Sequence, residues 1–240
     1  DKEIGEFLNA IGLPTLQGYG LTETSPVVSC NPIHKIKVET VGPPFKGNKV
    51  KIAEDGEILV KGENVMLGYW NKKEETAKVI RDGWLHTGDI GEIDIQDGYL
   101  KITDRKKDII VNAGGDNISP SRIEEKLNIE PEIAQSMIYG DYKNYLVAII
   151  VPDNDFSQQW ADKHNKTFPL AEISKDNDFF RTIKEVVDQV NKKLSVIEQV
   201  RKFIIIDHEF TIENKMMTPT LKVRRFVVKE KYGKQLEELY

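Results

Sequence analysis

The sequence predicts a mixed α+β fold, with a β-rich first half and a second half in which helices and strands alternate. The first half is predicted by short apolar runs that flank two turn-forming pairs, Asp55-Gly56 and Asp97-Gly98. The second half is predicted by apolar strands separated by one long helical stripe. A chain of 240 residues can hold one large or two small domains.

Two hairpins define the first half. Residues 50–52 and 58–60 flank the first turn, and residues 93–95 and 99–102 flank the second. Two hairpins so close together favour a small twisted sheet or barrel. The charged segment 103–108 follows, and it is either a solvated loop or a domain junction. Because the pattern changes just beyond it, we favour a junction.

The second half begins with a short apolar strand at 109–111 and a glycine-rich segment. Ser119-Pro120 is typical of an N-cap followed by proline at the first helical position. Ile123 and Leu127 lie four residues apart and would share one face of that helix. Further strands are predicted at 133–139, 146–151 and 203–206, a helix with a core-facing stripe (Phe179, Phe180, Ile183, Val186, Val187, Val190 and Leu194) at 178–194, and a closing helix at 228–239. Residues 1–45 give no clear pattern.

Composition excludes several classes of protein. The formal net charge of −5 provides no basic field for nucleic acid, so we expect no nucleic-acid partner. Cys30 is the one cysteine and cannot form an internal disulfide, which suits a reducing cytoplasm. No apolar run is long enough to span a bilayer. Because a motif begins within twenty residues of Asp1, we expect the natural N-terminus to lie upstream.

The first informative motif is the segment 17–24, Gln-Gly-Tyr-Gly-Leu-Thr-Glu-Thr. Glycines on both sides of Tyr19 allow close backbone approach, and Thr22, Glu23 and Thr24 add oxygens beside an aromatic face. Such a mixture suits a nucleotide with a divalent cation. The alternative is a strand-to-loop turn with a packed tyrosine, which the residue types alone favour.

The second motif is the segment 83–89, Gly-Trp-Leu-His-Thr-Gly-Asp. Asp89 follows a tight Thr-Gly turn and could present both carboxylate oxygens to a vicinal diol such as ribose. The alternative is ordinary turn chemistry. We expect a structural or solvent-facing role for His86, since the sequence shows no partner for it.

The third motif is the segment 218–225, Thr-Pro-Thr-Leu-Lys-Val-Arg-Arg. One interpretation is an exposed basic tail or a weak nucleic-acid patch, but aromatic residues do not interleave its cations. The other interpretation is a lysine, Lys222, on a mobile loop, where its compact charge could oppose negative charge on a phosphate.

The order of these motifs resembles the adenylate-forming superfamily, which includes acyl-CoA synthetases, non-ribosomal adenylation domains and luciferases. The resemblance covers nearly the whole chain. Thr220-Leu221-Lys222 and the loop at 113–117 are similar to the long-chain fatty acyl-CoA synthetase branch. The matching motifs are Tyr19 to Thr24, Gly56-Glu57-Ile58 through Gly68-Tyr69-Trp70 to Glu75-Thr76, Trp84 to Asp89, and Asp104-Arg105 through Ile118-Ser119-Pro120 to Glu124.

The resemblance implies a fold and a role for each matching position. Residues 1–106 would end a large adenylation domain, a β-rich distorted barrel, and residues 107–240 would form a mobile lid. The implied roles are Tyr19 stacked on the adenine, Gly20 as a cofactor-binding residue, Thr22 at the α-phosphate, Glu23 on magnesium, Asp89 and Arg105 on the ribose hydroxyls, Lys107 at the hinge, Gly114 and Gly115 in the pantetheine channel, and Lys222 as the adenylation lysine.

The implied activity is a long-chain fatty acid–CoA ligase that uses ATP, Mg²⁺ and coenzyme A, with AMP as product. We expect a cytoplasmic protein, with peripheral membrane contact as a further option for a long-chain substrate. Two alternatives stay open: an acyl-AMP ligase that passes its acyl group to a carrier protein, and a non-catalytic nucleotide-binding or interaction module.

This chain departs from the family pattern in three respects. Asp104-Arg105 stands where many members have Gly-Arg, and Thr220-Leu221-Lys222 replaces a Ser-Gly-Lys ending. Assigning adenylation to Lys222 rather than Lys215 therefore depends on the branch. The family's Ser/Thr/Gly-rich phosphate loop has no counterpart here and is expected upstream, so we predict that this chain alone is inactive.

Overall fold

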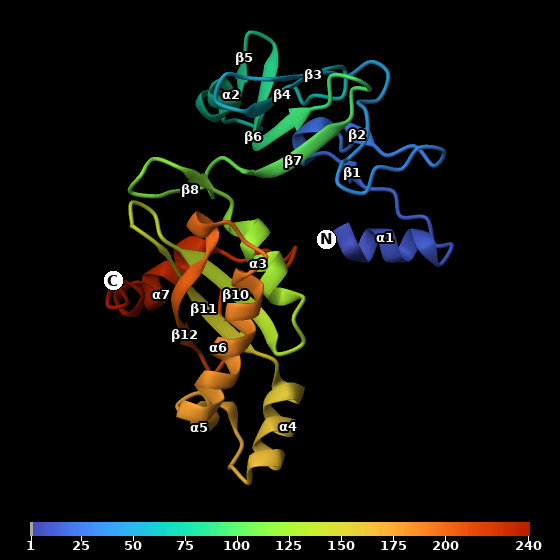
Figure 1. The fold of residues 1–240 in the computed structure, drawn as a ribbon. Coiled ribbons are helices and arrows are strands. Elements are labelled where there is room, and N and C mark those ends of the chain that lie inside the picture. Colours follow the sequence, from blue (N-terminus) through green and yellow to red (C-terminus); the bar gives the residue numbers. More distant parts are fainter. Residues whose placement is uncertain (1) are drawn as a thin grey trace. The chain divides into compact units, whose positions relative to one another are not determined.

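The computed structural model describes residues 2–240 and divides the chain into two compact units (Figure 1). The first unit ends at Asp108 and the second runs from Ile109 to Tyr240. The division falls at the end of the charged segment 103–108, two residues after the boundary expected between residues 106 and 107. No helix among residues 2–240 is long and apolar enough to cross a membrane.

The first unit contains a five-stranded sheet, as its two hairpins predicted. The first hairpin is confirmed: its strands pair antiparallel, and Gly56 has a φ of +83° in the turn. The second is displaced, because its first strand ends at Ile93 and Ile95 is fully exposed. The strands are β3 (Lys49–Ile52), β4 (Glu57–Lys61), β6 (Trp84–Ile93) and β5 (Ile80–Arg81) in that order, with β7 (Leu100–Arg105) also paired to β6.

The remainder of the first unit consists of short elements, most of them within residues 1–45, where no pattern was predicted. Tyr19 and Val28 bring this region into the core, where they pack with Ile58, Val60 and Leu100 from the sheet. The elements are α1 (Lys2–Ala10), β1 (Gly18–Tyr19) paired with β2 (Ser29–Cys30), the 3₁₀ turn η1 (Thr22–Thr24) and α2 (Lys73–Val79).

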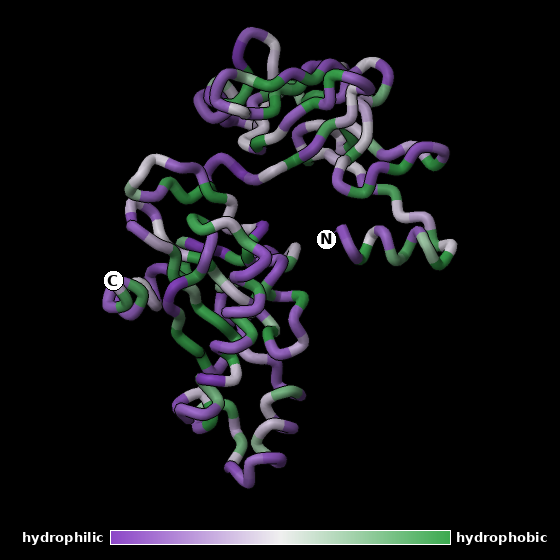
Figure 2. Tube along the Cα trace, in the orientation of Figure 1, coloured by the Kyte–Doolittle hydropathy of each residue, from purple (hydrophilic) through white to green (hydrophobic). Residues whose placement is uncertain are grey.

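The second unit is a three-stranded sheet with helices on both faces (Figure 1). Every residue of the central strand is buried, because α3 and α6 pack on one face of the sheet and α7 on the other. Figure 2 shows this strand as a continuous hydrophobic stretch, and the predicted strands at 133–139 and 146–151 are confirmed. The elements are β10 (Ile133–Tyr139), β11 (Leu146–Pro152), β12 (Val200–Ile205), α3 (Pro120–Asn128), α6 (Asn177–Asn191) and α7 (Arg225–Glu237).

Two predicted helices are present, one with its predicted N-cap and one with a predicted core position that differs. The Ser119 hydroxyl accepts a hydrogen bond from the Arg122 amide, which caps α3 as predicted. In α6 the apolar stripe is buried, but Phe180 is 37% exposed, so its place in the core stripe was wrong. It lies at the edge of that stripe and stacks on Phe203 instead. Four further elements are β8 (Ile110–Val111), β9 (Asn117–Ile118), α4 (Asn154–His164) and α5 (Leu170–Ile173).

Candidate nucleotide site

Three residues predicted to bind the nucleotide meet at Asp89 in the first unit. Asp89 lies in β6 directly opposite Arg105 in β7, because the two strands pair antiparallel in that register. The Arg105 Nε atom lies 2.8 Å from Asp89 Oδ1, and the Tyr19 hydroxyl donates a 2.7 Å hydrogen bond to Oδ2. Asp89 is 4% exposed, so both carboxylate oxygens are oriented by the protein.

Burial keeps the Tyr19 phenol protonated. Desolvation raises the pKa of Tyr19 far above its ordinary value, and its hydrogen bond to Asp89 raises it further. The phenol is therefore a donor at neutral pH. The Thr87 hydroxyl accepts from the Asp89 amide and donates to the carbonyl of Ile58, which fixes the turn before Asp89.

Glu57 is a residue whose role the sequence did not reveal. Its Oε1 accepts a 2.8 Å hydrogen bond from the Gly88 amide, while Oε2 contacts His86 and Lys106. Burial alone would raise the pKa of Glu57, but these three donors outweigh it and hold the pKa below its ordinary value. His86 therefore has a partner, 3.1 Å away on the neighbouring strand, and a structural role. The Gly-Glu-Ile motif thus supports the Thr-Gly-Asp turn.

The 3₁₀ turn after β1 and its flanking glycine contain both structural residues and residues that are accessible to a ligand. A Cβ atom on Gly20 would lie 1.6 Å from the carbonyl oxygen of Pro26, so only glycine fits there. Thr24 is fully buried and its hydroxyl accepts from the Leu21 amide, so its expected contribution of a ligand oxygen was wrong. Thr22 is exposed and Glu23 is half-buried, which leaves both accessible.

Glu23 also has a partner that the sequence did not indicate. The Tyr69 hydroxyl donates a 2.7 Å hydrogen bond to Glu23 Oε1, which raises the pKa of Tyr69 to about 12. Within residues 2–240, no group of three or more His, Cys, Asp and Glu side chains could hold a metal ion. One carboxylate fits a magnesium ion that takes its remaining ligands from substrate phosphates and water, but not a cage built by protein alone.

The glycine loop of the second unit joins β8 to β9. Gly115 has a φ of +86°, a conformation that favours glycine. Asn112 and Asp116 close the loop through side-chain and backbone hydrogen bonds. The Ala113 amide donates to the carbonyl of Lys143, which fastens the loop to the turn between β10 and β11. Gly114 and Gly115 therefore lie on a loop that hydrogen bonds hold in place within the second unit.

The two lysine candidates lie on exposed turns of the second unit. Thr218 closes the turn that carries Lys222: its amide donates to the Lys222 carbonyl, and its hydroxyl accepts from the Lys222 amide. Both Lys222 and Lys215 are exposed, so burial does not distinguish them. The predicted hinge residue, Lys107, lies in the first unit in a turn closed by the hydrogen bond from the Asp108 amide to the Arg105 carbonyl.

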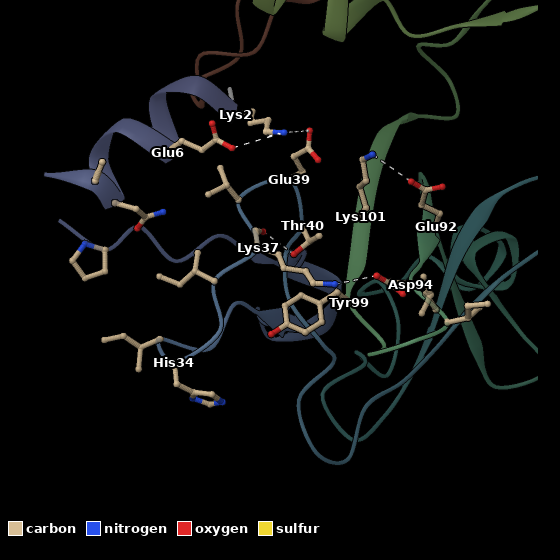
Figure 3. Close-up of a pocket in the computed structure, with 18 residues that line it drawn as sticks. Lys2, Glu6, His34, Lys37, Glu39, Thr40, Glu92, Asp94, Tyr99 and Lys101 are labelled. Carbon is tan, nitrogen blue, oxygen red and sulfur yellow. Dashed lines mark hydrogen bonds and ion pairs between the residues drawn. The ribbon is translucent and has the colours of Figure 1, made fainter. Parts of the chain in front are cut away.

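A separate cavity of about 1150 Å³ lies in the first unit (Figure 3). None of the predicted site residues lines it. One charged wall is centred on Lys37, whose ammonium lies 3.0 Å from Asp94 and 2.7 Å from Asp97 and also faces the ring of Tyr99. This wall therefore joins the loop before β3 to the β6–β7 connection, and the cavity is distinct from the Asp89 site.

We expect this wall to make stability depend on pH. The hydrogen bond from Lys37 lowers the pKa of Asp97 to about 2. A carboxyl group whose pKa is lowered by folding stabilises the protein at pH values above its ordinary pKa. That stabilisation is lost as the pH falls through the ordinary pKa towards 2. The difference in urea midpoint between the native protein and Asp97→Asn should therefore be larger at pH 6 than at pH 3. Glu54→Gln, in an exposed turn, is the control, and a difference independent of pH would contradict the prediction.

The fold of the chain is that of adenylation domains. The adenylation domain of a carboxylate reductase from Mycobacterium chelonae has a TM-score of 0.80 and 26% identity, over 99% of this chain and 36% of that one. O-succinylbenzoate coenzyme A synthetase from Bacillus subtilis, solved with AMP, has a TM-score of 0.72 and 26% identity, over 94% of this chain and 43% of that one.

Family models identify the chain. The AMP-binding enzyme model matches residues 1–70, and the AMP-binding enzyme C-terminal domain model matches residues 107–240. The chain therefore belongs to the AMP-binding enzyme family. It is 40% identical to the long-chain-fatty-acid–CoA ligase FadD15 of Mycobacterium bovis and 34% identical to the human long-chain-fatty-acid–CoA ligase 6, over 99% of this chain in each case. It spans 40% and 36% of the length of these relatives.

Proposed function

We propose that this chain is the C-terminal portion of an ATP-dependent long-chain fatty acid–CoA ligase. The observation that carries the proposal is the 40% identity to a relative of that name over 99% of this chain. The Asp89 cluster supports it, since Tyr19 and Arg105 hold the carboxylate ready for a vicinal diol. A longer protein is part of the proposal, and its upstream region would supply the phosphate loop and most of the acyl pocket.

The proposed chemistry has two half-reactions. A carboxylate oxygen of the fatty acid attacks the α-phosphorus of ATP, the bond to the β-phosphate oxygen breaks, and pyrophosphate leaves. The thiolate of coenzyme A then attacks the acyl carbon of the mixed anhydride and releases AMP. The first step makes the carboxylate, a poor electrophile, reactive enough for the second.

Each predicted site residue has a proposed role in these two half-reactions. Asp89 and Arg105 bind the ribose, Tyr19 stacks on the adenine with Gly20 beside it in the nucleotide site, and Thr22 lies at the α-phosphate. Glu23 would hold magnesium, which supplies charge neutralisation on the phosphates. Lys222 opposes the charge that builds up during adenylation. Lys107 is the proposed hinge, and Gly114 and Gly115 the proposed pantetheine channel.

A cytoplasmic location is proposed from the cysteine content and from the proposed substrate. A chain whose one cysteine, Cys30, has no internal disulfide partner suits a reducing cytoplasm. Peripheral contact with a membrane is proposed for access to long acyl chains, and no nucleic-acid partner is proposed.

The proposal is tested by activation of acids of graded chain length with the full-length protein. We expect thioester formation that requires ATP and coenzyme A and favours long acids. Adenylate without thioester would support transfer to a carrier protein instead, and no activation of any acid would favour a non-catalytic module. The chain of 240 residues, assayed alone, is expected to release no acid-dependent pyrophosphate.

A further inference from the structure

The Gly68-Tyr69 motif lies against the predicted metal ligand. The loop after β4 brings Tyr69 to the 3₁₀ turn, where its hydroxyl lies 2.7 Å from Glu23 Oε1. The backbone of the same loop also reaches the turn, since the Met66 amide donates a 2.8 Å hydrogen bond to the Glu23 carbonyl. Two bonds, one to the backbone and one to the side chain, thus join the loop to the same residue.

We propose that Tyr69 is a positioning residue that orients the Glu23 carboxylate towards a phosphate-bound magnesium ion, an inference that rests on the proposed function. The hydrogen bond engages Oε1, so Oε2 is the oxygen presented to a cation. A glutamate on a half-exposed turn would otherwise sample several rotamers, and ordering them on binding would weaken affinity. The bond fixes one rotamer in advance.

The loop is built to hold Tyr69 in place. The Tyr69 amide donates a 2.9 Å hydrogen bond to Thr76 Oγ1, and that hydroxyl donates in turn to the carbonyl of Lys72 at the start of α2. Gly68 has a φ of +146°, and a Cβ atom there would lie 2.7 Å from Thr76 Cγ2. Gly68, Tyr69 and Thr76 therefore act together, which gives a physical reason for their shared motif.

The two adjacent aromatic residues of this loop, Tyr69 and Trp70, differ in their surroundings. Trp70 is 89% exposed, whereas Tyr69 is 36% exposed and directs its hydroxyl at Glu23. Trp70 thus provides a matched control on the same loop, because removing part of its ring should leave Glu23 untouched.

The test is the binding of Mn²⁺, as a probe for magnesium, to the full-length protein with an ATP analogue that cannot be cleaved between its α- and β-phosphates. Free Mn²⁺ is measured by electron paramagnetic resonance. Tyr69→Phe is expected to weaken Mn²⁺ binding by up to about tenfold, the usual scale for ordering one side chain on binding. Trp70→Phe should match the native protein. Thr76→Ser should retain Mn²⁺ affinity, and Thr76→Val should lose part of it.

Two further measurements separate positioning from general damage. AMP affinity without metal should be unchanged in Tyr69→Phe, whereas a distorted site would lower it. In a Glu23→Ala background, Tyr69→Phe should have no further effect on Mn²⁺ binding. Native Mn²⁺ affinity in Tyr69→Phe, in a protein that still activates acids, would overturn this inference alone. Absence of metal-dependent nucleotide binding by the native protein would overturn both this inference and the proposed magnesium role.

Discussion

Lys222→Ala in the full-length protein is expected to lower acid-dependent ATP–pyrophosphate exchange by about a hundred- to a thousandfold. A cation that opposes charge on the reacting phosphate stabilises the transition state more than the bound substrate, so the loss should appear in kcat. The turn itself should persist, because it is closed by backbone groups and the Thr218 hydroxyl and not by the lysine ammonium. Thermal unfolding should therefore be unchanged.

Two comparisons make this result decisive. Lys215→Ala removes another exposed cation from the neighbouring turn and should leave exchange near the native rate. Supplying Lys222→Ala with ready-made acyl-adenylate and coenzyme A should restore thioester formation. If Lys215→Ala lost exchange and Lys222→Ala did not, the adenylation lysine would be Lys215. Equal loss of both half-reactions would contradict a role confined to adenylation.

Local and periodic signals predicted the helix α3 and the strands β10 and β11 of the second unit, but not its helices α4 and α5. The helix α3 begins where Ser119 and Pro120 indicated, because capping needs only the next few residues. The strand β11 was recognisable from its continuous apolar run, since a strand covered on both faces excludes polar residues. The prediction that Phe180 is buried was wrong, because helical periodicity gives the direction of a side chain around the helix axis but not the width of the face that neighbouring elements cover.

The supports of the candidate site could not be predicted in the same way. Tyr69 and Glu23 are 46 residues apart, and His86 and Glu57 are 29 apart, so only tertiary pairing brings each pair together. Thr24 looked like a ligand by residue type, yet its hydroxyl is used within its own turn. Motif order indicated the residues that we propose act on a ligand, whereas the residues that hold them depend on sheet register.

Asp89→Ala in the full-length protein is expected to lower AMP affinity about a hundredfold. The substitution removes the proposed acceptors for two ribose hydroxyls, and hydrogen bonds to a charged group are worth about 1.5–3 kcal/mol each, so the hundredfold loss corresponds to the lower end of that range. It should also lower the free energy of unfolding by about 2 kcal/mol, because the buried Tyr19 hydroxyl loses its acceptor. Arg105 is 42% exposed and can be hydrated, so it should add little. Equilibrium titration with a fluorescent AMP analogue and urea unfolding measure the two effects.

The two losses can be separated by adding Tyr19→Phe. Phenylalanine keeps the ring but removes the hydroxyl, so the double variant leaves no unpaired donor at this position. Removing both partners of a buried hydrogen bond is nearly neutral, and the double variant should therefore regain most of the lost stability. Its AMP affinity should stay about a hundredfold low, because the ribose acceptors are still missing. If affinity recovered together with stability, Asp89 would act by supporting the fold and not by binding the ribose.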